Sequence, residues 1–348
     1  MTRAMNSQKW ALFLKVNLGV FVLIILQGCN SSQKQDKEHL VFKYNEHSNI
    51  ATLDPAFARN PQTIWPSNQL FNGLVQLDDQ LNIQPDIAKS WHINDSTSTY
   101  TFTLRDDVYF HKNKVFKKDS TRSVVAQDFV YSFDRLLSPE LASPGSWVFN
   151  AVQRYHAAND STLVIQLNKP FPAFLGLLSM RYCSVVPKEA IAYYGNDFRS
   201  NPVGTGPFRF KFWEENVKLV LRKNPIYFEK DTQGNRLPYL EAVAITFLPD
   251  KQSEFLQFAQ GNIDFMTGLD NSYKDEIITT KGTLQPKYKD RVQLITTPYL
   301  NTEYLGFFMG STTKEIVSPL IRQAINYGFD REKMVTYLRN GMGIAATH

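Results

Sequence analysis

The stretch Asn201-Pro-Val-Gly-Thr-Gly-Pro-Phe-Arg-Phe-Lys-Phe-Trp213, followed by Val217-Lys-Leu-Val-Leu-Arg-Lys-Asn-Pro-Ile-Tyr-Phe228, carries the clearest pattern in this 348-residue chain. Glycine and proline punctuate its first part. Apolar and polar residues then alternate in two runs, which Glu214-Glu215-Asn216 separates. Alternation with a period of two places one set of side chains on each face of a strand. The stretch therefore predicts a β-hairpin that is entered through a Gly- and Pro-containing loop.

Other short motifs lie on both sides of this hairpin. They are Thr52-Leu-Asp-Pro55, Leu70-Phe-Asn-Gly-Leu-Val75, Ala88-Lys-Ser-Trp91, Tyr100-Thr-Phe-Thr-Leu-Arg105 with Phe110-His111, Asp128-Phe-Val-Tyr-Ser-Phe-Asp-Arg-Leu136, Pro170-Phe-Pro172, Leu237-Pro-Tyr-Leu240, Gly261-Asn-Ile-Asp264 and Ile321-Arg-Gln-Ala-Ile-Asn-Tyr-Gly-Phe-Asp-Arg331. Together with the loop and hairpin, and in this order, they resemble the peptide/opine/nickel class of extracytoplasmic solute-binding proteins, solute-binding family 5. The resemblance implies ligand capture without turnover, so we expect no enzyme activity and no cofactor.

The resemblance also implies a fold and a division into domains. The expected fold is α/β, the periplasmic binding protein-like class II fold with two lobes, in which an α+β domain is inserted into the first lobe. Lobe I, or domain I, would comprise residues 40–74 and 190–297, and domain II residues 75–189. Residues 298–348 would begin lobe II, as domain III. Family members continue well past residue 348, and roughly 50 residues rarely form a core of their own. We therefore expect an incomplete second lobe in a fragment or truncated product; a minimal variant is the alternative.

Hydrophobic periodicity and capping residues predict further elements. Strands are expected at 40–44, 100–105, 163–167, 243–247, 263–265 and 304–309, and helices at 64–74, 126–137, 252–260, 319–327 and 331–339. The helix at 126–137 would bury one face, formed by Phe129, Val130, Phe133, Leu136 and Leu137. Gly261 and Gly341 stand where helices would end, and Asp330 where one would begin.

The first 28 residues have the pattern of a signal peptide. Three cations and no acid precede or flank the apolar run from Val16 to Leu26, which is too short to span a bilayer. The run ends in Leu26-Gln-Gly-Cys29, which resembles a bacterial lipoprotein box, so Cys29 is the expected lipidation site. An ordinary signal peptide, with no role for Cys29, is the alternative. The polar residues 29–39 would form a tether.

Charge argues against nucleic acid as a partner. The chain has 38 basic and 33 acidic side chains. Loss of residues 1–28 would remove Arg3, Lys9 and Lys15 but no acid, leaving 35 and 33 and a net charge of +2. A domain that binds nucleic acid usually carries a strongly basic patch or stripe.

The residues that commonly carry catalysis or metals are scattered. The six histidines show no metal-ligand spacing, and His111 is expected to be structural. Cys183 lies in an apolar stretch and is expected to be a small buried side chain, although a reactive thiol is the alternative. Gly204-Thr-Gly206 lacks the third glycine and the following helix of a phosphate loop. The sequence Gly-x-Ser-x-Gly of hydrolases is absent, which argues against a lipid-anchored hydrolase. Asp78-Asp79 and Asp106-Asp107 are expected to be solvated turn residues.

The resemblance implies two ligand-contacting segments in the crevice between the lobes. The first follows the Leu-Asp-Pro motif and contains Ala58, Arg59, Asn60 and Pro61; the second contains Gly145, Ser146 and Trp147. A guanidinium such as that of Arg59 can bind a carboxylate through two hydrogen bonds, and Trp147 offers a large surface for packing. A solvated surface arginine and a domain II core tryptophan are the alternatives. Thr205 and Gly206 are expected to shape the interdomain turn.

These observations lead to one functional hypothesis and its alternatives. We expect a monomeric substrate-binding lipoprotein of an ABC importer, in the periplasm or cell envelope, which binds oligopeptides or dipeptides and delivers them to membrane permease subunits. No metal is expected. A nickel chelate, an opine, a sugar or haem is the alternative solute, and a truncated fragment that binds nothing is the alternative state.

Overall fold

The computed structural model describes residues 40–94, 96, 98–117, 120–270, 272–296, 301–310 and 318–347. The predicted signal peptide, Cys29 and the tether lie outside the described residues. The chain forms two compact units. Unit 1 comprises Met1–Pro249 with Gly261–Phe265, and unit 2 comprises Asp250–Gln260 with Met266–His348.

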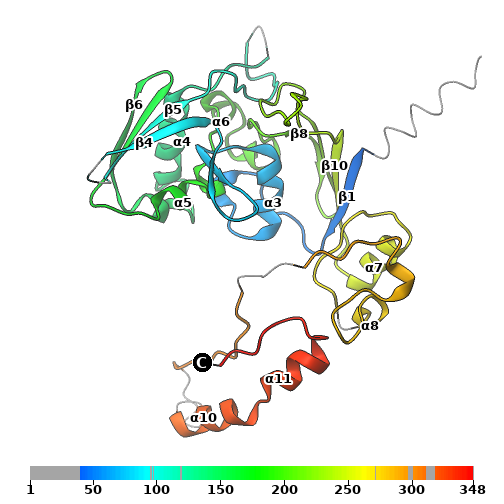
Figure 1. The fold of residues 1–348 in the computed structure, drawn as a ribbon. Helices are drawn as coiled ribbons and strands as arrows, with labels where there is room; N and C mark the ends of the chain where they lie inside the picture. The colour runs from blue at the N-terminus through cyan, green and yellow to red at the C-terminus, as the bar shows by residue number, and fades with distance from the viewer. Residues whose placement is uncertain are drawn as a thin grey trace, which may run out of the picture. The chain divides into compact units, whose positions relative to one another are not determined.

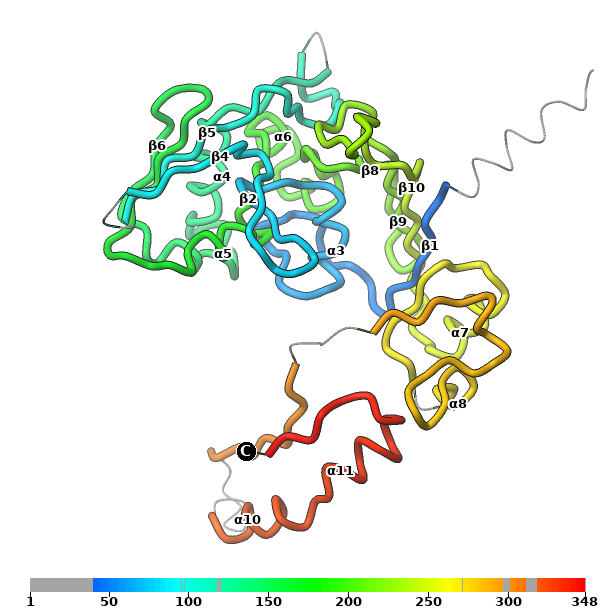
Figure 2. Tube along the Cα trace, in the orientation of Figure 1, coloured from blue at the N-terminus to red at the C-terminus, as the bar shows by residue number. Residues whose placement is uncertain are grey.

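The hairpin predicted at residues 208–221 is confirmed and belongs to a four-stranded sheet. Its strands are β1 (Val41–Glu46), β8 (Phe208–Glu214), β9 (Lys218–Lys223) and β10 (Ala242–Phe247), in the order β1-β10-β9-β8. β9 pairs antiparallel with β8 and β10, whereas β1 pairs parallel with β10. Figure 2 shows the start of the described chain, in blue, beside the yellow-green strand β10. Residues 41–46 and 242–247 therefore share one sheet although the whole inserted region separates them in sequence.

The inserted region has its own four-stranded antiparallel sheet, in the order β4-β5-β7-β6. The strands are β4 (Ala88–Ile93), β5 (Thr99–Leu104), β6 (Val152–Asn159) and β7 (Thr162–Leu167). Helix α4 (Ala126–Leu137) packs against β6 and β7 and buries Phe129, Phe133 and Leu136 (Figure 1). The helix bounds are confirmed, but Leu137 is 40% exposed, so its predicted burial is wrong. Residues 129, 133 and 136 follow a spacing of four and three, and Leu137 lies at the edge of that stripe.

Shorter elements connect the two sheets. They are the 3-10 helix η2 (Pro55–Phe57), α3 (Pro61–Leu70), β2 (Val75–Leu77), β3 (Ile83–Pro85), η3 (Ser146–Phe149), α5 (Phe174–Leu178), η4 (Arg181–Cys183), α6 (Lys188–Tyr194) and η5 (Gly195–Ser200). The helix expected at 64–74 begins and ends earlier. Asn60 caps it by accepting a hydrogen bond from the Thr63 backbone, and the proline at 61 is tolerated in the first turn.

One continuous hydrophobic core joins these elements in unit 1. It extends from Tyr44 in β1 through Phe102 and Phe133 in the inserted region to Phe247 in β10. Residues 75–189 therefore belong to the same compact unit as the first sheet. Unit 2 begins at Asp250, which lies within the predicted lobe I. The division into domains at residues 74, 189 and 297 stays a proposal.

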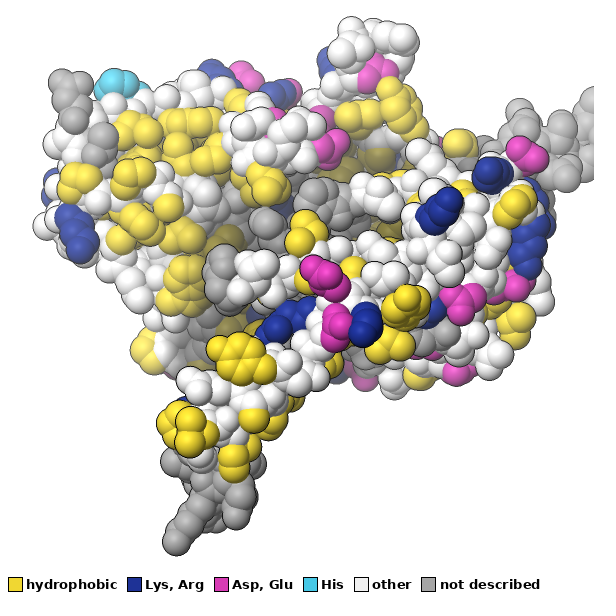
Figure 3. All heavy atoms as spheres, turned by 60° about the horizontal axis from the view of Figure 1, so that its bottom comes forward, with side chains coloured by type: hydrophobic (Ala, Val, Ile, Leu, Met, Phe, Trp, Pro, Cys, Tyr) yellow, Lys and Arg dark blue, Asp and Glu magenta, His cyan; other side chains and the backbone are white. Residues whose placement is uncertain are grey.

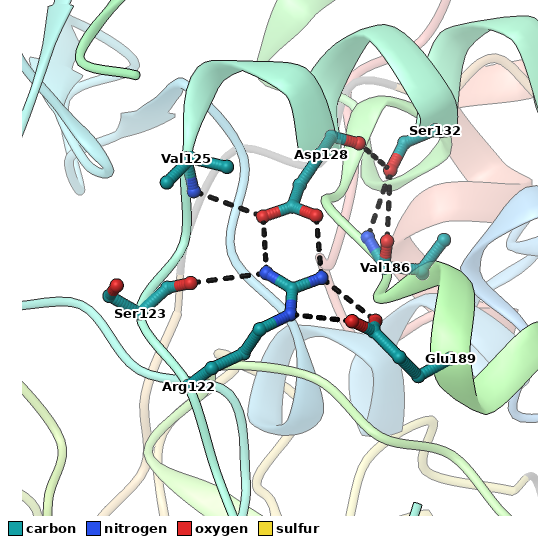
Figure 4. A network of polar contacts seen from close by, with 7 residues as sticks. All are labelled: Arg122, Ser123, Val125, Asp128, Ser132, Val186 and Glu189. Atoms are coloured by element: carbon teal, nitrogen blue, oxygen red, sulfur yellow. Dashed lines mark hydrogen bonds and ion pairs between the residues drawn. The ribbon is translucent and has the colours of Figure 1, made fainter. Parts of the chain in front are cut away.

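A charged cluster of Arg122, Asp128 and Glu189 connects helix α4 to helix α6. The Arg122 guanidinium lies between the carboxylates of Asp128 and Glu189 and donates two hydrogen bonds of 2.7–2.8 Å to each (Figure 4). Asp128 also accepts from the Val125 backbone at 3.0 Å, at the start of α4. The cluster thereby links the loop before α4, the first turn of α4 and the first turn of α6.

Unit 2 contains helices and little described core. Its elements are α7 (Lys251–Ala259), α8 (Lys274–Ile277), η6 (Pro286–Tyr288), α10 (Pro319–Gly328), α11 (Arg331–Lys333) and a short π-helix η7 (Met334–Leu338). Asp330 caps α11 as predicted, and Gly261 and Gly341 have φ of +77° and +74°. Residues 304–309 form no strand, so that prediction is wrong. Their large side chains are exposed, and a strand needs a partner or a packed face. Of the strand expected at 263–265, only a bridge from Phe265 to Tyr44 forms.

Two surface loops of unit 1 have the same local architecture. In one, the Asp78 carboxylate accepts from the backbone of Gln80 and Asn82 and from the Asn82 amide. In the other, Asp231 accepts from the corresponding groups of Gln233 and Asn235. Both loops thus share the sequence Asp-x-Gln-x-Asn. The fourth position has positive φ in each, at +63° for Leu81 and +86° for Gly234.

The paired loops predict opposite effects for opposite substitutions. Leu81→Gly should raise the free energy of unfolding by up to about 1 kcal/mol, because a left-handed conformation strains a residue with a Cβ, and Leu81 is 64% exposed and loses little packing. Gly234→Leu should lower it by about 1 kcal/mol. Urea denaturation followed by tryptophan fluorescence measures both, since Trp65, Trp91, Trp147 and Trp213 all lie in unit 1. Equal stability of Leu81→Gly and wild type would contradict the strain argument.

Candidate functional site

The first predicted segment is held rigidly against α4. The Asp54 side chain accepts from the Ala56 backbone at 3.0 Å and so caps η2. Arg135 of α4 donates two hydrogen bonds to the two oxygens of Asp54, at 3.0 and 2.5 Å. Both side chains are largely buried, at 13% and 5% exposure. This ion pair fixes the position from which residues 58–61 continue.

The structure brings the two predicted segments together. The Ser143 hydroxyl donates to the Ala56 carbonyl at 2.5 Å and accepts from the Gly145 backbone at 3.0 Å. Residues 56 and 145 are therefore joined through one side chain, although 89 positions separate them in the sequence. A buried serine between two turns leaves no sequence motif, so this link was not predicted.

The predicted residues differ in what they present to solvent. Ala58 is buried, Asn60 uses its side chain to cap α3, and Pro61 is the first residue of that helix. Gly145 is buried, and Ser146 begins η3. Only Arg59 and Trp147 offer large exposed side chains; Trp147 is 46% exposed and is not a core residue. That these seven residues contact a ligand stays a proposal.

Tyr182 of η4 lies beside these two segments, and nothing in the sequence predicted it. The residue is only 8% exposed, and its ring lies against Gly145, where a Cβ would overlap the ring carbons Cγ and Cδ1. η4 also packs against η2. Burial raises the pKa of Tyr182, and the positive charge of Arg59 opposes this shift, so the two side chains interact electrostatically. No motif in Arg181-Tyr182-Cys183 could have signalled this position.

A buried polar network lies beside η4 and holds it in place. Arg181 donates to the Phe71 carbonyl at 3.0 Å. The Asp86 carboxylate accepts from the Asn72 amide at 2.9 Å and from the Gly73 backbone at 3.1 Å. The Thr205 hydroxyl, in the Gly- and Pro-containing loop, donates to the side-chain amide oxygen of Asn72 at 2.9 Å. The network thus connects that loop to the element that carries Tyr182.

The same loop packs tightly against the end of α3. Gly204 and Gly206 contact the backbone of Gln69 and Leu70 so closely that neither has room for a Cβ. His111 completes the packing: its Nδ1 accepts from the Gly204 backbone at 3.3 Å, and its Nε2 lies 3.0 Å from the Gly206 carbonyl. Burial lowers the pKa of His111 to about 4, so the neutral ring with a proton on Nε2 fits both contacts. His111 therefore has the structural role that the sequence predicted.

The titration of Asp86 tests this network. Burial raises its pKa to about 7, against the opposing charge of Arg181. Because the folded state binds the proton more tightly than the unfolded state, the contribution of Asp86 to stability is most favourable below its unfolded pKa. It declines as the pH rises from about 4 to 7, by up to about 1.4 kcal/mol per unit. Carboxyl ¹³C NMR should show Asp86 titrating near pH 7, with Asp86→Asn assigning the signal; titration below pH 5 would contradict the assignment.

Metal-binding groups and a reactive thiol were the remaining candidates for chemistry in this chain. Among these residues, no group of three His, Cys, Asp or Glu side chains is placed to hold a metal ion. Cys183 is 1% exposed, and burial raises the pKa of its thiol to about 12, which disfavours the reactive thiolate. Figure 3 shows both signs of charge interspersed on the face that it presents. None of the described helices has the length and hydropathy to cross a membrane.

The fold is that of the periplasmic binding proteins, because it matches solved structures of that class. A sequence profile described as bacterial extracellular solute-binding proteins, family 5 (middle region), matches residues 82–348. The chain belongs to this family. The expected fold class is thereby confirmed, and so is the resemblance noted in the sequence.

Similar proteins include binders of several solutes. The chain is 24% identical to the glutathione-binding protein GsiB of Salmonella typhi, over 86% of this chain and 54% of that protein. It is 29% identical to heme-binding protein A of Haemophilus influenzae, over 93% and 61%. The structure of the Escherichia coli murein tripeptide binding protein MppA matches with a TM-score of 0.71 and 25% identity, over 86% and 58%. The chain thus spans between half and two thirds of the length of these relatives.

Proposed function

We propose that the protein is the substrate-binding component of an ABC importer that captures oligopeptides or dipeptides. It would deliver them to membrane permease subunits without a covalent step. The observation that carries this proposal is the pair of exposed side chains, Arg59 and Trp147, on two loops joined through Ser143 and Ala56. Such loops, held on a packed scaffold, suit recognition of a small ligand, because binding groups work best when their supports are rigid.

The relatives support a peptide or peptide-like solute. Two of the three similar proteins named above are described as binding glutathione or a murein tripeptide, and both ligands contain amino acids joined by amide bonds. The third is described as binding haem, which keeps haem among the candidates. Within this proposal, the ligand contacts residues 58–61 and 145–147. The protein acts as a monomer. The protein works in the periplasm or cell envelope, lipidated at Cys29.

A ligand panel tests the proposal. Thermal unfolding of the full chain would be measured with di- and tripeptides, glutathione, haem, a nickel chelate, an opine and sugars. A ligand at about 100 times its dissociation constant should stabilise the folded state by roughly 2.7 kcal/mol. We expect peptides to raise the melting temperature, and Trp147→Ala to weaken their binding. Stabilisation by haem alone, or by no member of the panel, would contradict the peptide proposal.

The lipid anchor has its own test. Metabolic labelling with a fatty acid, followed by membrane fractionation, should show label on the wild-type protein and none on Cys29→Ser. Equal labelling of the two proteins would contradict lipidation at Cys29. This outcome is independent of which solute binds.

A further inference from the structure

Arg59 and Tyr182 present unused hydrogen-bonding capacity at one place on unit 1. The Arg59 side chain is exposed and makes no ion pair or hydrogen bond with the described residues. The Tyr182 hydroxyl likewise has no hydrogen-bond partner among them, and it is not one of the atoms that are buried without a partner. The Tyr182 hydroxyl therefore keeps some contact with solvent, although the residue as a whole is only 8% exposed.

The scaffold positions the two turns that carry these groups. Arg59 follows directly from η2, which the Asp54–Arg135 ion pair and the Ser143–Ala56 hydrogen bond hold. Tyr182 is confined by Gly145 on one side and anchored through its neighbour Arg181 to the Phe71 carbonyl. η2 and η4 pack against each other, so a cationic donor and a neutral hydroxyl donor stand on adjoining turns.

This arrangement suits one kind of chemical group. A guanidinium can donate two parallel hydrogen bonds to a carboxylate, and a tyrosine hydroxyl can donate a third. No carboxylate of the described residues pairs with Arg59, so the charge is available for a ligand. A cationic ligand group would be repelled by the Arg59 charge, and an aliphatic group would leave both donors without an acceptor.

We propose that Arg59 and Tyr182 together bind a carboxylate of the ligand and make the protein prefer anionic solutes. Tyr182 is then a specificity-determining residue that complements Arg59. The inference rests on the function proposed above and names the chemistry that the site selects. The carboxylate belongs either to the C-terminus of a peptide or to an acidic side chain; both have the same chemistry.

Four matched peptides distinguish these two sources. They are Ala-Glu-Ala and Ala-Gln-Ala, each with a free and with an amidated C-terminus, and their affinities for the purified full chain would be measured by calorimetry. Loss of the carboxylate that the pair binds should weaken binding by about 10- to 100-fold, the usual effect of a charge-assisted hydrogen bond. Loss of the other carboxylate should change affinity less than about threefold.

Variants test the assignment to these residues. Arg59→Gln should abolish the preference, so that the charged and neutral peptides bind with similar affinity, and Tyr182→Phe should reduce the preference about five- to tenfold. Arg105→Gln, which alters an exposed arginine paired with Asp107, is the control and should leave the preference unchanged. A preference that survives Arg59→Gln, or its absence in the wild type, would overturn the inference while the peptide function stands. If none of the peptides binds while another solute class does, the proposed function fails and the inference fails with it.

Discussion

Replacing Arg122 by methionine should lower the free energy of unfolding of unit 1 by up to roughly 3 kcal/mol, because the buried Asp128 carboxylate would lose the cation that pairs with it. Methionine keeps most of the volume but removes the charge. Asp128, whose side chain is 6% exposed, and Glu189 would then face each other without a cation between them. Both carboxylates would also lose two hydrogen bonds each. Urea denaturation followed by tryptophan fluorescence would measure the loss.

Arg105→Met is the matched control for this prediction. Arg105 makes the same two-point contact with Asp107, at 2.8 Å for each hydrogen bond. The two arginines are similarly exposed, at 33% and 28%, but Asp107 is 52% exposed whereas Asp128 is 6% exposed. An exposed pair contributes about 0–1 kcal/mol, so this variant should be nearly as stable as the wild type. Similar losses for both variants would show that burial does not set the strength of the Arg122 cluster.

The loss caused by Arg122→Met should also depend on pH. Hydrogen bonding from Arg122 lowers the pKa of Glu189 below its ordinary value. A lowered folded-state pKa contributes stability that is present above the unfolded pKa and lost as the pH falls through the folded value. The difference between variant and wild type should therefore shrink in acid. A difference that is constant down to pH 3 would contradict this linkage.

Gly204→Ala should be the most damaging small substitution in the chain, with a loss of about 3 kcal/mol or more, a size typical of overpacked or strained sites. The added Cβ would overlap the Leu70 carbonyl oxygen and lie 2.6 Å from Phe71 Cδ1. Because the first of these is backbone, no rotamer change relieves the overlap. The hydrogen bonds of His111 to this loop would be displaced with it. Failure of the variant to accumulate in a folded form would agree with the prediction.

Gly176→Ala provides the control with the same change in side chain. Gly176 lies in α5, and a Cβ there would have no neighbour within 4 Å. Alanine favours a helix over glycine by about 1 kcal/mol, so this variant should be as stable as the wild type or slightly more stable. If Gly204→Ala folds with wild-type stability, the close packing of the loop on α3 is wrong. Thermal denaturation of the two variants side by side would show the difference.

The close packing at Gly204 gives the most distinctive sequence in the chain a structural role. The Gly204-Thr-Gly206 segment lacks the features of a phosphate site, and in the structure its glycines serve close approach of two backbones. Thr205 of the same segment donates a hydrogen bond to the Asn72 side chain, which in turn donates one to Asp86. The loop therefore supports the elements that carry Arg59 and Tyr182, and it need not contact a ligand itself.

Local pattern was enough to predict much of the fold. Period-two alternation identified β8 and β9, and the 3.6-residue stripe identified the bounds of α4, because these periods follow from backbone geometry alone. The prediction failed where local pattern and tertiary environment disagree. Residues 304–309 have strand-like composition but form no strand, since a strand is stable only with a partner.

The amino-acid sequence by itself determined the hairpin and the main helix, since each depends on residues close together in the chain. It also indicated the family, through the order of many short motifs, and a structural role for His111, through the lack of metal-ligand spacing. Only the tertiary structure decided that residues 56 and 145 are joined through Ser143, that Arg122 lies between two carboxylates, and that Tyr182 stands beside Arg59. Those contacts join residues between 6 and 123 positions apart in the sequence. A contact across such distances depends on how buried surfaces pack, and a single sequence carries no local periodic signal of that packing.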